Sequence, residues 1–189
     1  KNSSTNSILT AYTPDVNENI AWNSLTTHCK LLCFKVTEII ARDESYTYFL
    51  LQDLGNTSLI YHVSQGIDEK VINLYKRVLR DLIKFQVKGI EGLDLDLAYP
   101  TCSFDKRSIM WDLNYFKYYF IKTNGIIFSE TKLENDFEQF TAYLLSAESE
   151  YFMYRDFQSR NIMIFQDEPW YIDFQGGRKG PLQYDLISL

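Results

Sequence analysis

The stretch Tyr151-Phe-Met-Tyr-Arg-Asp-Phe-Gln-Ser-Arg-Asn-Ile-Met-Ile164, followed by Tyr171-Ile-Asp-Phe174, decides the fold of this chain. It places Asp156 and Asn161 five residues apart, and Asp173 twelve residues after Asn161. An Asp-x-x-x-x-Asn loop, a short strand and an apolar run that ends in Asp form a layout typical of phosphoryl-transfer sites. In such sites one carboxylate orients the attacking hydroxyl, while an amide and a second carboxylate hold Mg²⁺ against the nucleotide phosphates.

Two short apolar segments separate the amide from the second carboxylate. Residues 161–165 and 169–173 predict strands, and the polar residues Gln166-Asp167-Glu168 predict the turn between them. A hairpin with these ends would bring Asn161 and Asp173 close together. Mg²⁺ binds few protein oxygens and keeps water and phosphate at its other positions, so one amide and one carboxylate suit it.

Each fragment alone has a plainer explanation. Asp-x-x-x-x-Asn occurs by chance in many chains, and an Asp at the end of a strand often only caps a turn. The three polar groups in this order, with a hairpin between them, are far more specific than any one of them.

Two longer motifs carry a resemblance to a known family. They are Tyr154-Arg-Asp-Phe-Gln-Ser-Arg-Asn161 and Ile172-Asp-Phe-Gln-Gly-Gly-Arg-Lys-Gly-Pro-Leu-Gln-Tyr-Asp185. The chain resembles the aminoglycoside phosphotransferase and choline kinase-like family from about Tyr12 to Leu189. The similarity is greatest to a bacterial subgroup that includes anomeric kinases of N-acetylmuramate and N-acetylglucosamine. The family usually has His where this chain has Tyr154, a position mostly used for packing and hydrogen bonding.

The resemblance implies a role for each polar residue. Asp156 would be the catalytic base, and Asn161 and Asp173 would be the Mg²⁺ ligands. Arg155 would be a structural neighbour of the base. Asp185 would be structural, tying the metal loop to the helix that follows.

The N-terminal portion reads as a small lobe that contains β-strands. Residues 7–12 and 46–51 predict strands, residues 34–40 predict extended chain, and Asp15 opens a helix that runs to about Leu32. By resemblance, Leu51-Gln-Asp-Leu-Gly55 would be the hinge, where backbone groups of Gln52, Asp53 and Leu54 would bond the adenine of ATP. An ordinary turn after a strand explains the same five residues equally well.

Other parts of a kinase small lobe are poorly marked. Ser3-Ser4 would be what remains of a phosphate-covering loop, but no Gly-x-Gly-x-x-Gly is present. No Val-Ala-Ile-Lys-type lysine follows, and Lys1 is too far upstream to serve. Glu18 therefore has no assigned ion-pair partner.

From residue 68 the chain reads as mainly helical. A buried face is predicted for Val71, Leu74, Tyr75, Val78, Leu79 and Leu82, and a second for Leu133, Phe137, Phe140 and Leu144. The segment from Phe104 to Phe120 is aromatic on several faces, which favours a buried helix. The alternative is that Trp111, Asp112, Tyr115 or Lys117 lines an acceptor pocket, where an aromatic ring stacks on a sugar.

Composition limits the possible functions. The chain has 189 residues, 46% of them hydrophobic, which is enough for a substantial core. A net charge of −6 argues against a nucleic-acid partner, and no apolar run reaches membrane-spanning length. Three cysteines without metal-ligand spacing suggest free thiols in a reducing cytoplasm. Arg178 and Lys179 would either neutralise an anion or form a solvated basic turn.

We therefore predict an α+β, protein kinase-like fold that is incomplete at both ends. Residues 1–55 would form the N-lobe, with a hinge near 51–55. Residues 56–189 would form the helical C-lobe, with a catalytic loop at 154–161 and a metal loop at 172–177.

The predicted activity is ATP- and Mg²⁺-dependent phosphorylation of a hydroxyl on a small molecule, most simply an amino sugar. The alternatives are an aminoglycoside or choline-type alcohol kinase, or a nucleotide-binding module without catalysis. A protein kinase is disfavoured because no Ala-Pro-Glu follows Asp173.

Overall fold

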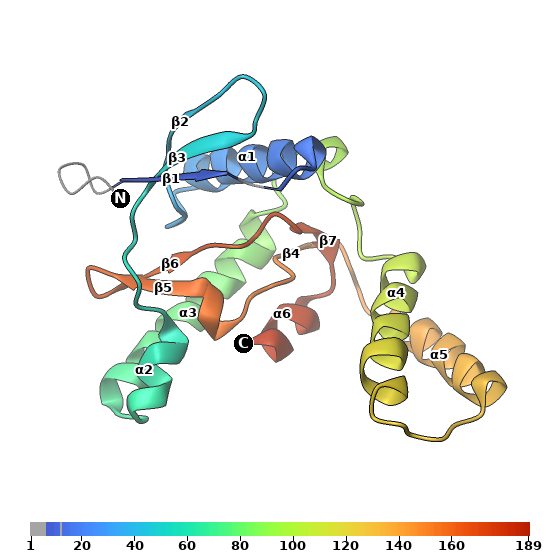
Figure 1. Cartoon of the computed structure of the whole chain (residues 1–189). Coiled ribbons are helices and arrows are strands. Elements are labelled where there is room, and N and C mark those ends of the chain that lie inside the picture. The colour runs from blue at the N-terminus through green and yellow to red at the C-terminus, as the bar shows by residue number, and fades with distance from the viewer. Residues whose placement is uncertain (1–6, 12) are drawn as a thin grey trace.

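The computed structural model describes residues 7–11 and 13–189. A small lobe precedes a larger, mainly helical one, as predicted (Figure 1). The small lobe contains β1 (Ser7–Ala11), α1 (Val16–Leu31), β2 (Ile39–Arg42) and β3 (Tyr48–Gln52). The predicted remnant of a phosphate-covering loop at Ser3-Ser4 and the predicted strand residue Tyr12 lie outside the described residues, as does Lys1.

The larger lobe begins with helices and ends in short strands. Its elements are α2 (Leu59–Gln65), α3 (Glu69–Lys88), η1 (Leu95–Leu97), α4 (Lys106–Phe116), the π-helical turn η2 (Lys117–Lys122), α5 (Glu130–Leu144), β4 (Tyr151–Met153), η3 (Ser159–Asn161), β5 (Ile162–Phe165), β6 (Glu168–Tyr171), β7 (Arg178–Gly180) and α6 (Leu182–Ser188). Within the described part of the chain, no helix has the length and apolar character needed to cross a bilayer.

The small lobe is an antiparallel sheet with one helix packed on it. The strand order is β1-β3-β2, and α1 lies along one face of the sheet (Figure 1). Trp22 on α1 packs edge-on against Phe49 of β3, with ring centroids 5.0 Å apart. Asp15 is the N-cap of α1 and accepts a hydrogen bond from the Asn17 amide at 3.0 Å, so the predicted helix start is confirmed.

The predicted hairpin is present as β5 and β6. The strands pair antiparallel, with Ile162 opposite Tyr171. The turn consists of Gln166 and Asp167, whose φ angles of 53° and 58° are both left-handed, as the tight turns preferred by hairpins require. Glu168, which we assigned to the turn, instead begins β6.

One continuous core joins the two lobes. Its buried side chains come from α1, β3, α3 and the C-terminal strands and loops, and include Trp22, Leu25, Phe49, Leu74, Val78, Leu82, Phe85, Phe152, Tyr154, Phe157, Tyr171 and Phe174. The predicted buried face of α3 is largely confirmed, although Tyr75 is half-buried and Leu79 is exposed. On α5, Phe137 is buried as predicted, whereas Phe140 is exposed.

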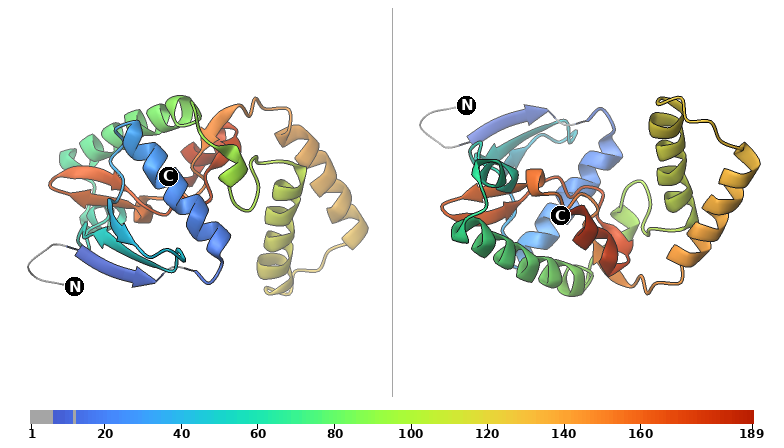
Figure 2. Two further views of the ribbon diagram at one scale, coloured as in Figure 1. Left: turned by 90° about the horizontal axis from the view of Figure 1, so that it is seen from above. Right: turned by 90° about the horizontal axis from the view of Figure 1, so that it is seen from below.

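The prediction of a buried aromatic helix is wrong. Trp111 is 63% exposed, and Tyr115, Phe116, Tyr118, Tyr119 and Phe120 are also exposed. Only Ile109 and Ile121 bury apolar side chains on this face, because α4 and η2 pack against α5 alone for most of their length. Viewed from above and from below, the α4–α5 hairpin stands apart from the rest of the molecule (Figure 2).

The strand β7 approaches β4 so closely that glycine is required beside it. A Cβ added to Gly177 would lie 2.7 and 2.9 Å from two ring carbons of Phe152, whose side chain is buried. We therefore expect Gly177→Ala to lower the free energy of unfolding by about 1–3 kcal/mol, because a well-packed core must shift to admit the methyl group. Urea unfolding measured by circular dichroism tests this.

The double variant Gly177→Ala/Phe152→Leu provides the control. The smaller Leu makes room for the methyl group, so the alanine should cost less in this background than alone. Equal costs in the two backgrounds would contradict the predicted steric clash.

Candidate functional site

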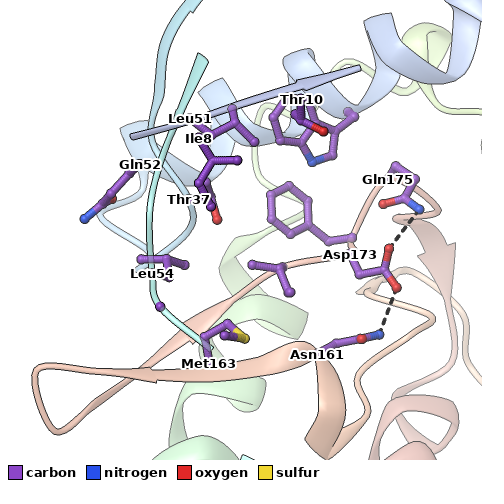
Figure 3. A pocket seen from close by; sticks show the side chains of 14 residues that line it. Ile8, Thr10, Thr37, Leu51, Gln52, Leu54, Asn161, Met163, Asp173 and Gln175 are labelled. Atoms are coloured by element: carbon purple, nitrogen blue, oxygen red, sulfur yellow. Dashed lines mark hydrogen bonds between the residues drawn. The ribbon is translucent and has the colours of Figure 1, made fainter. Parts of the chain in front are cut away.

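A cleft of about 490 Å³ lies between the small-lobe sheet and the β5–β6 hairpin. Its upper wall comes from β1 and β3 and its floor from the hairpin and the loop that follows it (Figure 3). Among its lining residues are Ile8, Thr37, Leu51, Gln52, Leu54, Asn161, Met163 and Asp173. Much of the wall is apolar, and Asn161, Asp173 and Gln175 form a polar group at one end (Figure 3).

Asn161 and Asp173 meet at that end, as the hairpin predicted. The Asn161 side-chain amide donates to the Asp173 carboxylate at 3.0 Å, and the Gln175 amide donates to the other carboxylate oxygen at 3.1 Å (Figure 3). Asp173 itself adopts a left-handed backbone with φ 68°, which is uncommon for Asp and is characteristic of functional loops. Gln175 was not predicted, since glutamine after a metal ligand has no distinctive spacing.

Asp156 lies next to this pair. Its backbone carbonyl accepts a hydrogen bond from the same Asn161 amide at 3.0 Å. Burial raises the pKa of the Asp156 carboxyl, and the neighbouring Asp173 carboxylate raises it further. The three predicted polar groups thus belong to one cluster, linked through Asn161.

Tyr154 occupies the position at which the family that the chain resembles usually has His, and its contacts show what a tyrosine does there. Its ring packs edge-on against Phe85, Phe157 and Phe174, and its hydroxyl donates to the Ile172 carbonyl at 2.5 Å. That bond connects the start of the catalytic loop with the residue before Asp173. The position is therefore used for packing and hydrogen bonding, as we expected.

Asp185 anchors the predicted catalytic loop through hydrogen bonds to its backbone. Its buried carboxylate accepts hydrogen bonds from the backbone amides of Tyr154 and Arg155, both at 2.8 Å. Arg155 has a left-handed φ of 79°, and this pair of bonds fixes it in that conformation. Asp185 is structural as predicted, but its direct hydrogen-bond partners are in the catalytic loop rather than in the metal loop.

The predicted hinge lies along the cleft. Gln52 and Leu54 line it, and the Asp53 side chain accepts a hydrogen bond from the Gly55 amide at 2.9 Å, closing a turn. A backbone role of these residues in nucleotide binding stays a prediction.

A second cavity of about 630 Å³ lies beside Asp156, and Gln175 lines both this cavity and the cleft. Trp111 and Tyr115 of α4 line it together with Asp112, Arg155 and Asp156. Asp112 and Arg155 form an ion pair at 3.2 Å. Of the residues that we proposed for an acceptor pocket, Trp111, Asp112 and Tyr115 of α4 line this cavity, whereas Lys117, the first residue of η2, does not.

Three cations that we predicted to face solvent or a site have structural partners, although Arg178 also lines the second cavity. Lys117 is buried and pairs with Glu130 and Glu134 of α5. Arg178 is also buried and donates to Gly176, Thr101 and Tyr99, so the basic turn is not solvated. Lys179 forms an ion pair with Glu150.

The donor set suits Mg²⁺ better than a softer metal. Asn161 offers an amide oxygen and Asp173 an exposed carboxylate, which leaves most coordination positions to water and phosphate. In the described residues, no group of three His, Cys, Asp or Glu side chains could hold a metal ion. Cys29 is buried, Cys33 and Cys102 are exposed, and all three are free thiols, as predicted.

Known proteins resemble this chain in sequence and in fold. No protein-family model matches the chain. The chain is 27% identical over 158 residues to an N-acetylmuramate/N-acetylglucosamine kinase of Neisseria meningitidis serogroup B, an alignment that covers 82% of this chain and 45% of that protein. It is 25% identical over 157 residues to the protein of the same description in Pseudomonas aeruginosa, covering 82% and 44%. The chain thus spans somewhat less than half the length of these relatives.

Solved structures confirm the fold. The gentamicin complex of APH(2″)-IIa matches with a TM-score of 0.61 and 13% identity, over 97% of this chain and 63% of that one. The streptomycin–ATP complex of APH(2″)-IIa matches with a TM-score of 0.59 and 11% identity, over 96% and 63%. The predicted resemblance to aminoglycoside phosphotransferases and amino-sugar kinases is confirmed.

The buried carboxylate of Asp185 yields a stability prediction. Asp185→Ala would leave the two loop amides without an acceptor, at a cost of about 1–3 kcal/mol for each. Asp185→Asn keeps one acceptor oxygen and should lose less. Urea unfolding of the native protein, Asp185→Asn and Asp185→Ala at pH 7 measures their free energies of unfolding, which should decrease in that order.

The pH dependence of the free energy of unfolding provides a second test of the Asp185 carboxylate. Burial raises its pKa from 3.8 to about 6, so the folded protein holds this proton more tightly than the unfolded chain. The contribution of Asp185 to stability is therefore greatest below pH 3.8 and falls as the pH rises to about 6. The stability gap between the native protein and Asp185→Asn should narrow over that range, and a gap independent of pH would contradict the raised pKa.

Proposed function

We propose that this chain belongs to an ATP- and Mg²⁺-dependent kinase that phosphorylates a hydroxyl group of a small molecule. The observation that carries the proposal is the cluster of Asp156, Asn161 and Asp173 at the end of the interlobe cleft. Two of these groups face the cleft, and the third faces the adjacent cavity. A phosphoryl donor and an acceptor could therefore approach from opposite sides of one cluster.

The cleft would take the nucleotide. Its apolar walls suit the adenine ring, and the backbone of Gln52, Asp53 and Leu54 is positioned along its edge. Asn161 and Asp173 would hold Mg²⁺, which neutralises charge on the transferred phosphoryl group when bound. One solved structure with the same fold is a ternary complex of APH(2″)-IIa with ATP and streptomycin, so this fold can hold a nucleotide and an acceptor together.

The second cavity would take the acceptor. Asp156 would accept the hydroxyl proton or orient the hydroxyl, and its raised pKa reflects the partly buried position that such a role requires. Trp111 and Tyr115 offer exposed aromatic faces, which suit the apolar face of a sugar ring.

Among small-molecule acceptors we favour an amino sugar. The curated relatives are described as kinases of N-acetylmuramate and N-acetylglucosamine. Within the cavity the Asp112 carboxylate is already paired with Arg155, and Arg178 adds a second buried positive charge. Glu18 and Asp156 also line the cavity, so three carboxylates face two guanidinium groups, and the preference for an amino sugar rests on the relatives rather than on the charge of the cavity.

Replacing the proposed base tests the chemistry. Asp156→Asn should reduce turnover by about 10²- to 10⁴-fold, the usual contribution of a general base. Phosphate transfer to N-acetylglucosamine, N-acetylmuramate, kanamycin and choline is measured with the native protein and the variant. Asp136→Asn, an exposed carboxylate on α5, is the control and should keep full activity.

Thermal stabilisation by ATP and Mg²⁺ separates the remaining possibilities. A kinase should show both stabilisation and transfer, and the Asp156→Asn protein should keep the stabilisation. Stabilisation of the native protein without transfer to any of these acceptors would favour the non-catalytic nucleotide-binding module.

The aromatic wall gives a prediction about the acceptor alone. Trp111→Ala should raise the KM for the sugar several-fold, because stacking against an exposed ring contributes about 1 kcal/mol. The KM for ATP should stay unchanged, since Trp111 does not line the nucleotide cleft. Tyr61→Ala, which removes an exposed aromatic ring on α2 that lines neither cavity, is the control. An equal change in both KM values would argue against an acceptor role.

A further inference from the structure

A third cavity, of about 340 Å³, lies behind the β5–β6 hairpin and outside both sites described above. It is enclosed by the end of α1 with the segment that follows it, by α3 and by β6. Five cationic side chains line it, and only two carboxylates do. They are Lys35, Arg77, Arg80, Lys84 and Lys88 against Asp81 and Glu168. The excess of three positive charges is unusual in a chain whose net charge is −6.

The carboxylates cannot neutralise these cations. Glu168 is shared, since both Lys35 and Arg77 form ion pairs with it. Asp81 pairs with Lys84 at 2.9 Å and also accepts a hydrogen bond from the Tyr171 hydroxyl at 2.9 Å.

Two of the five cationic side chains have no carboxylate partner among the described residues. Arg80 and Lys88 form no ion pair with any carboxylate of residues 7–11 and 13–189. Both are on α3, eight residues apart, which separates them by about 12 Å along the helix axis and about 80° around it, with Lys84 between them. With both groups at one cavity, a ligand with two negative charges would find a partner for each.

The cavity also has an apolar wall. Phe34 stacks obliquely on Phe85, with ring centroids 4.2 Å apart, and Leu32 extends this surface. Phe34 is only partly buried. Cationic groups around an apolar wall form a site for a compact organic anion rather than a merely solvated face.

We propose that this cavity binds a small phosphate-bearing anion, either free phosphate or a phosphate ester. Arg80, Lys84 and Lys88 would contact the phosphate oxygens, with Arg77 and Lys35 contributing from beyond Glu168. A phosphate group fits because it carries close to two negative charges and accepts several hydrogen bonds from guanidinium and ammonium groups. A nucleic acid is excluded by the small volume and by the acidic remainder of the chain.

The site has a direct connection to the metal loop. Tyr171 lines the cavity and lies two residues before Asp173. The Tyr171 amide donates to the Lys35 carbonyl at 2.8 Å, so the same strand is tied to the cavity wall. Binding at this site does not depend on the proposed kinase activity, and it can be measured without ATP or Mg²⁺.

Cys33 provides a built-in reporter. Its exposed thiol lines the cavity, Cys29 is buried, and Cys102 is exposed but does not line it. We expect phosphate, pyrophosphate or glucose 1-phosphate to slow alkylation of Cys33 by iodoacetamide, roughly tenfold at about ten times the dissociation constant. The rate at Cys102 should not change. Sodium chloride at matched ionic strength controls for screening, and mass spectrometry of peptides reads both rates.

Two variants localise the effect. Arg80→Gln/Lys88→Gln should abolish the protection of Cys33, whereas Lys106→Gln/Lys132→Gln, two exposed lysines on α4 and α5, should retain it. Asp173→Asn should also retain it, which separates this cavity from the metal site. Comparing the three anions shows whether free phosphate or an ester is preferred. No protection by any of them, or equal protection by chloride, would overturn the proposal.

Discussion

Two backbone amides in the catalytic loop depend on one buried carboxylate. Asp185 is fully buried, and it compensates that burial by accepting bonds from Tyr154 and Arg155. Burial of an unpaired carboxylate would be very costly, so the contact specifies how α6 meets the loop. Arg155 is fixed with a left-handed backbone, and Asp156 follows immediately in the cluster with Asn161. The position of the proposed base thus depends on a residue some thirty positions later in the chain.

The sequence predicted correctly those features that depend on residues close together in the chain. The β5–β6 hairpin and the approach of Asn161 to Asp173 follow from two apolar runs and a polar turn, and the start of α1 follows from Asp15. The prediction that position 154 is used for packing and hydrogen bonding was also correct, because the Tyr154 ring packs in the core and its hydroxyl donates a hydrogen bond.

The sequence predicted burial poorly where contacts between distant segments determine which side chains are covered. The aromatic residues from Trp111 to Phe120 suggested a buried helix, yet α4 has one helical neighbour for most of its length and leaves most of these rings exposed. Periodicity reports how apolar a face is and not what covers it. Sequence left Arg178 either in a solvated turn or beside an anion, but its guanidinium is buried and donates to the nearby Gly176 carbonyl and to two oxygens distant in sequence, on Thr101 and Tyr99. The third cavity combines residues of α1's C-terminal flank, α3 and β6, which no single motif could have revealed.

The separation of the α4–α5 hairpin from the common core has a mechanical consequence. The side chains that hold Asn161 and Asp173 belong to the shared core, whereas Trp111 and Tyr115 stand on a pair of helices with little other support. Thermal motion can therefore tilt this wall by small amounts while the polar cluster stays in place. Substitutions on α4 can therefore change the proposed acceptor wall without altering the core that holds the proposed phosphoryl-transfer cluster.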